Sequence, residues 1–141
     1  MLKNPFGYSH ASVEGVTTTS MKYYASTSFM WSELSCKCGC GNIYIQDEAI
    51  DKLQKTRNIV QVPLIINSAA RCPIHNARVG GAPKSQHRAT KARPSTAFDI
   101  SLQGIDKEKL IDAARLAGFK GFGIHYNSFL HVDNRKFAAV W

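Results

Sequence analysis

The stretch Thr96–Asp133, TAFDISLQGIDKEKLIDAARLAGFKGFGIHYNSFLHVD, changes its hydrophobic period twice. Apolar and polar residues alternate over residues 96–102, which predicts a strand. Residues 106–117 carry apolar side chains at helical spacing, with Asp106 as the N-cap and Gly118 as the stop. The apolar face expected of this helix consists of Leu110, Ile111, Ala114 and Leu116.

Elements on both sides of this helix complete the expected fold. They are a helix at 46–59, a strand at 60–67, a loop or short helical turn at 72–84, and strands at 121–126, 129–133 and 136–140. The helix at 46–59 is predicted from an apolar stripe made by Ile45, Ala49, Ile50 and Leu53. Clustered hairpins after a helix favour an α+β fold, a small and mainly antiparallel sheet with helices packed on one side.

The length and charge of the chain limit its organisation and its partners. A chain of 141 residues suffices for one domain with a core. Residues 1–31 are polar and aromatic, and we expect them to form an arm packed on a body made by residues 32–141. No apolar run is long enough to span a membrane, and no export signal is visible. The net charge of +8 predicts attraction to a polyanion, such as nucleic acid, anionic membrane or bacterial cell wall.

Polar residues interrupt two of the expected strands. Asp99 lies between Phe98 and Ile100, while His131 and Asp133 alternate with apolar neighbours, so that polar side chains leave one face of each strand. A carboxylate among bulky apolar residues needs a cation. Two histidines and a carboxylate are a common zinc ligand set that leaves a position for water. Without a metal, a loop histidine and a structural histidine–aspartate pair explain the same pattern.

Four segments with polar residues follow one another in a characteristic order. They are Ser68-Ala-Ala-Arg-Cys-Pro-Ile-His-Asn76 with Gly80-Gly81, Ser85-Gln-His87, Ala97-Phe-Asp-Ile100 and Phe129-Leu-His-Val-Asp-Asn-Arg135. Together, over residues 32–137, they resemble the zinc D-Ala-D-Ala carboxypeptidase and L-alanyl-D-glutamate endopeptidase family. That family includes bacterial cell-wall peptidases and phage endolysins, and it shares its fold with the Hedgehog signalling domain.

The resemblance implies a role for each matching residue. The implied ligands of a catalytic zinc ion are His87, Asp99 and His131. Arg71 matches an arginine that binds the substrate carboxylate or stabilises the developing oxyanion, which suits its planar fork. Ser85 matches a serine that lines the site and contacts substrate. Asp133 matches an aspartate that we expect to orient a ligand or to act as the general base.

The spacing between the first two implied ligands departs from the family pattern. Asp99 follows His87 by twelve positions. We interpret the difference as an insertion of about five residues in a surface loop, a change that loops tolerate. If His87 is not the ligand, His125 and His75 are the alternatives.

A second departure concerns the general base. Several branches of the family place an acidic residue three positions before the last histidine ligand, where this chain has Ser128. A serine cannot take the proton from a zinc-activated water. The base is therefore expected to be Asp133, His125 or another group, although His125 also fits a half-exposed strand histidine.

The four cysteines allow more than one interpretation. Cys36, Cys38 and Cys40 lie within six residues, and Cys72 lies far along the chain. A structural zinc site, with His75 as a further ligand, is one option. A disulfide from the first segment to Cys72, or free thiols, is the other, and relatives often keep cysteines in both segments. Reduced thiols are the default without an export signal, and the spacing of the cluster favours a disulfide or free thiols over a second zinc.

The expected function is zinc-dependent hydrolysis of peptide bonds in peptidoglycan stem peptides. A protein made in the cytoplasm could act in this way as a phage lysis enzyme, as a virion peptidase or as a bacterial enzyme exported by another route. Lys84, Arg88, Lys91 and Arg93 make the surroundings of His87 basic, which suits anionic cell wall and the carboxylates of stem peptides. The alternatives are a nucleic-acid-binding zinc ribbon and a non-catalytic cell-wall-binding domain of the same fold. We expect a monomer without nucleic-acid or membrane partners.

Overall fold

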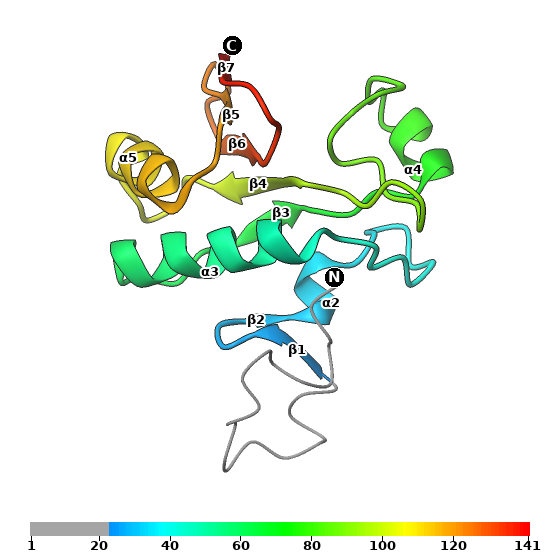
Figure 1. The fold of residues 1–141 in the computed structure, drawn as a ribbon, viewed down its shortest axis with the longest axis horizontal. Coiled ribbons are helices and arrows are strands. Elements are labelled where there is room, and N and C mark those ends of the chain that lie inside the picture. The colour runs from blue at the N-terminus through cyan, green and yellow to red at the C-terminus, as the bar shows by residue number, and fades with distance from the viewer. Residues whose placement is uncertain (1–22) are drawn as a thin grey trace.

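Two sheets and four helices make up residues 23–141, the part of the chain that the computed structural model describes (Figure 1). The strands are β1 (Tyr24–Ser26), β2 (Phe29–Met30), β3 (Ile66–Ser68), β4 (Ala97–Ser101), β5 (Gly121–Gly123), β6 (Phe129–Asp133) and β7 (Ala139–Val140). The helices are α2 (Trp31–Leu34), α3 (Asp47–Val60), α4 (Pro73–Arg78) and α5 (Lys107–Ala117). The predicted α+β class is confirmed.

The larger sheet has the strand order β3-β4-β6-β5-β7. Its neighbouring strands are antiparallel, apart from β5 and β7, which are parallel. The central strands β4 and β6 pair without a bulge, and Asp99 lies directly opposite His131. Because main-chain hydrogen bonds set this register, they also set the separation of the two polar side chains.

Helices α3 and α5 pack against each other, and their buried residues join those of β4 and β6 in one core. The core residues of the two strands are Phe98, Ile100, Leu130 and Val132. Each such side chain contributes about 1.5–3 kcal/mol to stability through burial. Because side chains alternate along a strand, Asp99 and His131 leave the opposite face of the sheet. The helices therefore stabilise one face and leave the other free for a site.

Helix α5 begins and ends where the sequence predicts. The Asp106 carboxylate caps its first turn, and Gly118 ends it with a φ of 108°, a conformation that favours glycine. The prediction of Leu116 on the apolar face is wrong, since this residue is 70% exposed. The 3.6-residue repeat turns Ala113 and Ala117 toward the core instead.

The strand expected at residues 60–67 is shorter than predicted and begins at Ile66. Helix α3 continues to Val60, and Gln61 ends it in the left-handed conformation with a φ of 57°. Pro63 then cannot donate a ladder hydrogen bond, so pairing starts after it. The helix expected at residues 46–59 is confirmed with a shift of one residue at each end.

The first described strands belong to the expected N-terminal arm, of which residues 1–22 lie outside the described residues. Strand β1 contacts α3. There Ser26 Oγ donates to Gln54 Oε1 at 2.7 Å, and the backbone N–H of Ser28 donates to the same oxygen at 2.8 Å. The division of the chain into residues 1–31 and 32–141 stays a prediction. Between residues 23 and 141, no helix has the length and apolar character that a membrane span needs.

Candidate metal centre and active site

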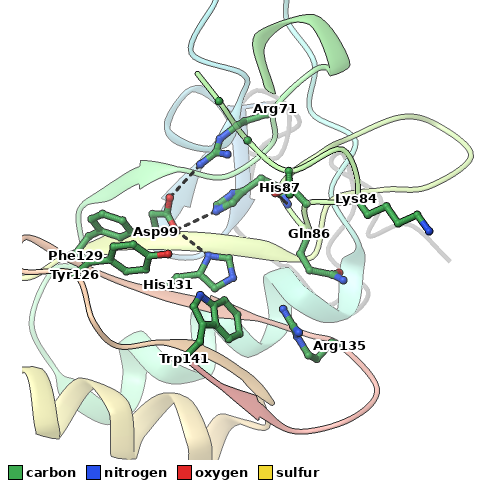
Figure 2. Close-up of a pocket in the computed structure, with 14 residues that line it drawn as sticks. Arg71, Lys84, Gln86, His87, Asp99, Tyr126, Phe129, His131, Arg135 and Trp141 are labelled. Atoms are coloured by element: carbon green, nitrogen blue, oxygen red, sulfur yellow. Dashed lines mark hydrogen bonds and ion pairs between the residues drawn. The ribbon is translucent and has the colours of Figure 1, made fainter. Parts of the chain in front are cut away.

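His87 reaches the sheet from the loop that precedes β4. The backbone N–H of Arg71 donates to the carbonyl of His87 at 2.8 Å, and the N–H of Ala89 donates to the carbonyl of Arg71 at 2.7 Å. These bonds hold the His87 segment beside the segment that follows β3. The buried ring of His87 lies next to Asp99 and His131 (Figure 2). One loop and two strands thus bring together the three residues that the sequence suggests as metal ligands.

A single carboxylate oxygen faces both imidazole rings. Asp99 Oδ1 lies 3.0 Å from His87 Nε2 and 3.0 Å from His131 Nδ1. Each of the three side chains offers one ligand atom, and these atoms lie within 4.8 Å of one another. All three residues are buried, so the donors are shielded from bulk water. The composition and the spacing of this group are those with which it could hold a metal ion.

The second nitrogen of each ring also has an oxygen partner. His87 Nδ1 lies 2.8 Å from the carbonyl of Ala69, and His131 Nε2 lies 2.8 Å from Asp133 Oδ2. These oxygens can accept a hydrogen from the outer nitrogens in the tautomer that leaves both inner nitrogens free for a metal ion. In that tautomer the inner lone pairs face Asp99 Oδ1, and a cation between the three atoms would join them. Metal-binding histidines are held in this way, and the donor set fits zinc.

Asp133 lies fully buried behind His131. Arg135 binds it with both ends of its fork, Nε to Oδ1 at 2.7 Å and Nη2 to Oδ2 at 2.7 Å, a strong bidentate pair. Gly121 in β5 leaves room for this pair, because a Cβ there would lie 2.0 Å from Asp133 Oδ1. Asp133 is absent from the described residues that line the adjacent pocket.

Burial and hydrogen bonds shift the pKa values of the groups at the centre in opposite directions. Burial raises the pKa of Asp99, but hydrogen bonds with His131 and His87 outweigh it and hold this pKa below its ordinary value. Burial also raises the pKa of Asp133, yet Arg135 and His131 lower it to about 2. Burial lowers the pKa of His131, while hydrogen bonds with Asp133 and Asp99 raise it above its ordinary value. Both carboxylates are therefore ionised at neutral pH, and the centre favours a cation.

The guanidinium group of Arg71 is fixed beside the centre. Its Nη2 donates to Asp99 Oδ2 at 3.3 Å, its Nε to Ser68 Oγ at 3.0 Å and its Nη1 to Asn76 Oδ1 at 3.4 Å. Asp99 thus gives one oxygen to the histidines and the other to the arginine (Figure 2). Part of the side chain stays exposed, and Arg71 lines the pocket over the centre.

Aromatic side chains form one side of this pocket. The rings of Tyr126 and Phe129 stack with centres 4.4 Å apart. The ring centre of Trp141 lies 5.1 Å from that of His131, and the Arg135 guanidinium lies 4.7 Å from the centre of the Trp141 ring. Figure 2 shows Trp141 next to His131, across the centre from Arg71, and Tyr126 and Phe129 beside Asp99. They offer an apolar surface next to the polar donors.

The described lining of the pocket carries excess positive charge. It contains Arg71, Lys84 and Arg135, and Asp99 is the acidic residue among the described residues there. A positively charged cleft attracts negatively charged ligands and raises their encounter rate. The pocket therefore suits a substrate with carboxylate groups.

Of the other residues that the sequence suggests, some line the pocket and some do not. Ser85 lines the pocket, and its Oγ accepts a hydrogen bond from the backbone N–H of His87 at 3.1 Å. His75 and His125 do not occur among the described residues of the lining, and His125 is exposed. Ser128 borders a different pocket. The structure thus brings His87 to Asp99, rather than either alternative histidine.

The sequence analysis assigns no role to Tyr126, Arg135 or Trp141, which also line the pocket. A local sequence signal exists for Arg135, because it follows Asp133 by two positions and its side chain can reach the carboxylate of Asp133. Trp141 has none, since it arrives through the parallel pairing of β7 with β5, where its N–H donates to the carbonyl of Phe122 at 2.9 Å.

The segment 88–95, where we expect an insertion, is tied down at both ends. The N–H of Ala89 and that of Ser95 donate to main-chain carbonyls of other segments, and the N–H of Thr96 donates to the carbonyl of Gln86 at 2.9 Å. Residues 91–93 between these anchors are exposed. An insertion at this tip would therefore lie at the surface, outside the main-chain bonds that hold His87.

The cysteines form a second cluster. All four are free, so the disulfide that the sequence allows is not formed. Cys36, Cys38, Cys40 and Cys72 are not among the described residues that line the pocket. Their sulfur atoms nevertheless lie within 4.8 Å of one another. His75 contacts this cluster through its backbone N–H, which donates to the sulfur of Cys72 at 3.3 Å.

An α+β fold that brings two histidines and an aspartate together below a basic pocket fits a metal-dependent hydrolase. The profile of the family described as Peptidase M15 matches residues 24–133. The chain belongs to this family, whose members are zinc-dependent peptidases. No curated protein matches the chain at a significant level.

Proposed function

We propose that this chain is a zinc-dependent peptidase that hydrolyses peptide bonds in the stem peptides of peptidoglycan, as a phage lysis enzyme or a bacterial cell-wall enzyme does. The observation that carries the proposal is the convergence of His87, Asp99 and His131 at the base of an open pocket that Arg71 also lines. Membership of the M15 family supports the peptidase class. The positive charge and the aromatic side of the pocket support an acidic peptide as substrate.

His87 Nε2, Asp99 Oδ1 and His131 Nδ1 are the atoms that we assign to zinc binding. When bound, zinc polarises a carbonyl group and lowers the pKa of water to about 7. The chain itself fixes the direction of the donors. The Ala69 carbonyl and Asp133 each hold the outer nitrogen of one ring, so the inner lone pairs point at a common centre.

We propose that the guanidinium group of Arg71 binds negative charge on the substrate. The group is already held by Ser68, Asn76 and Asp99, so little entropy is lost when it binds. We assign it either to the terminal carboxylate of a stem peptide or to the carbonyl oxygen that gains charge during hydrolysis.

The walls of the pocket position the rest of the peptide. We propose that Lys84 and Arg135 attract the carboxylates of D-glutamate and diaminopimelate, and that Ser85 donates a hydrogen bond to the peptide backbone. Tyr126 and Trp141 would pack against the apolar parts of the stem peptide and exclude water from the bond that is cut.

We assign Asp133 to the orientation of His131 rather than to proton transfer. Its two oxygens are engaged by Arg135 and His131, and it is fully buried. A general base must lie within hydrogen-bond reach of the proton that it removes. Asp133 has no such access from the pocket, whose described lining does not include it.

Substitution of Asp133→Asn separates the two roles. As an orienting residue, Asp133 contributes to zinc affinity, and we expect the variant to bind zinc about 10–100-fold more weakly. Excess zinc should then restore most of its turnover. If Asp133 were the base, the variant would keep its zinc affinity and lose turnover by about 10²–10⁴-fold at every zinc concentration. Asp112→Asn, on the exposed side of α5, is the matched control.

Digestion of purified peptidoglycan tests the proposed function. The zinc-loaded protein should release peptide fragments with new amino and carboxyl ends, and a chelator should stop the reaction until zinc is returned. Mass spectrometry of the fragments distinguishes removal of the terminal D-alanine from cleavage between L-alanine and D-glutamate. Intact peptidoglycan with bound protein would refute the enzyme and favour a non-catalytic cell-wall-binding domain.

A further inference from the structure

Two distant segments bring all four cysteines of the chain together. The loop that follows α2 carries Cys36, Cys38 and Cys40, and Cys72 precedes α4. The sulfur of Cys38 lies 3.4 Å from that of Cys36 and 3.8 Å from that of Cys72. Tetrahedral zinc with Zn–S bonds of about 2.3 Å places its sulfurs about 3.8 Å apart. The cluster thus already has the dimensions of a four-thiolate zinc site.

Main-chain turns explain how closely spaced cysteines face one centre. Gly39 has a φ of 87°, and its N–H donates to the carbonyl of Cys36 at 3.1 Å. Gly41 has a φ of 82°, and the N–H of Cys36 donates to the carbonyl of Asn42 at 2.9 Å. Residues with a side chain rarely adopt these φ values. The turns at these two glycines therefore allow cysteines only two positions apart to face one centre, although zinc ligands are usually spaced more widely.

Backbone donors already point at two of the sulfurs. The N–H of Cys72 lies 3.4 Å from the sulfur of Cys36, and the N–H of His75 lies 3.3 Å from the sulfur of Cys72. Such hydrogen bonds stabilise thiolates, and outer contacts of this kind orient the ligands of metal sites.

One disulfide or four free thiols would leave some of the sulfurs without a bonded partner, whereas a metal ion would bind all four. A disulfide between two of the cysteines would leave the remaining two thiols beside it without a bonding partner. Free thiols would leave Cys38 and Cys40 exposed and open to oxidation. Four thiolates around one ion engage every sulfur, and a tetrahedral set of four thiolates is a common ligand set of structural zinc.

We propose that Cys36, Cys38, Cys40 and Cys72 bind a structural zinc ion, separate from the His87–Asp99–His131 centre, and that this ion holds Arg71 in place. On binding, each protonated thiol releases its proton to solvent and forms one Zn–S bond. Arg71 directly precedes Cys72, and the N–H of Ala70 donates to the carbonyl of Leu34 at 3.2 Å, so the ion clamps the two segments beside the active site.

Metal analysis of the purified protein tests the site. We expect two zinc ions per chain. The double variant Cys36→Ser/Cys40→Ser should keep one, and His131→Ala should also keep one. Cobalt in place of zinc should give the sulfur-to-cobalt charge-transfer absorption in the His131→Ala variant, in which every cysteine is intact. Absence of this absorption, or a mass two hydrogens lower than that of four free thiols, would overturn the proposal even if the double variant fails to fold.

The effect on Arg71 has its own test, and this part of the proposal rests on the proposed function. A mercurial reagent that displaces zinc from thiolates should release one ion and lower kcat by about tenfold or more, since small displacements of positioning groups are costly. In the Arg71→Lys variant the same treatment should cause no further loss. An equal loss in both proteins would refute the link to Arg71, while the zinc count would still decide the metal site.

Discussion

The His131→Ala variant should lose one zinc ion per chain and at least about a thousandfold in peptidoglycan hydrolysis. His131 supplies one of three donor atoms and is opposed to Asp99 in the sheet register, so the substitution removes a ligand that the fold itself positions. Without it the site cannot supply water of lowered pKa, which accounts for a large share of metal-assisted hydrolysis. Elemental analysis and turnover, measured on the same preparation, check the prediction.

Two further variants show whether this loss is specific. His131→Gln keeps a polar group next to Asp133 and should fold, yet it should still lose the zinc ion. His125→Ala removes an exposed histidine that does not occur in the described lining of the pocket, and it should keep both zinc and activity. Retention of full zinc content by His131→Ala would contradict the ligand assignment. Loss of activity by His125→Ala with zinc retained would make His125 the base.

Replacement of Arg71 by lysine should lower kcat/KM by about 10²–10³-fold without loss of zinc. Lysine keeps the charge but not the planar fork, which here is held by Ser68, Asn76 and Asp99. Arg93→Lys, at the exposed tip of the 88–95 loop, makes the same chemical change outside the pocket and should be neutral. If zinc is lost with Arg71→Lys, the arginine acts mainly by holding Asp99.

A pair of substrates identifies the charge that Arg71 binds. One stem peptide carries a free terminal carboxylate, and the other carries an amide at that end. If the fork binds the carboxylate, the penalty for Arg71→Lys should nearly disappear with the amide. If the fork stabilises the carbonyl oxygen during hydrolysis, both substrates should show the same penalty.

The sequence predicts those parts of the fold and the site that depend on local patterns. Alternation around His131 predicts strand β6 with its observed ends, because neighbouring side chains point to opposite faces. The same alternation separates Asp99 from Phe98 and so predicts which face carries the donors. The cap at Asp106 and the stop at Gly118 likewise predict α5.

The remaining features depend on contacts between distant segments. The parallel pairing of β7, which brings Trp141 to the pocket, leaves no period in the sequence. The sequence allows Asp133 two roles, and the contact with Arg135 that favours the proposed orienting role is visible only in the folded chain. The cysteine spacing favours a disulfide or free thiols, whereas positive φ values at Gly39 and Gly41 fold the loop around a common centre.

The anchored segment 88–95 is a surface loop whose length can vary independently of the candidate metal centre. Its ends are closed by main-chain bonds, so residues can be added or removed at its exposed tip without strain on His87 or on β4. A change of length at this exposed tip should therefore leave the contacts of His87 intact. The tip is thus a position at which a foreign segment could be grafted without disturbing the candidate metal centre.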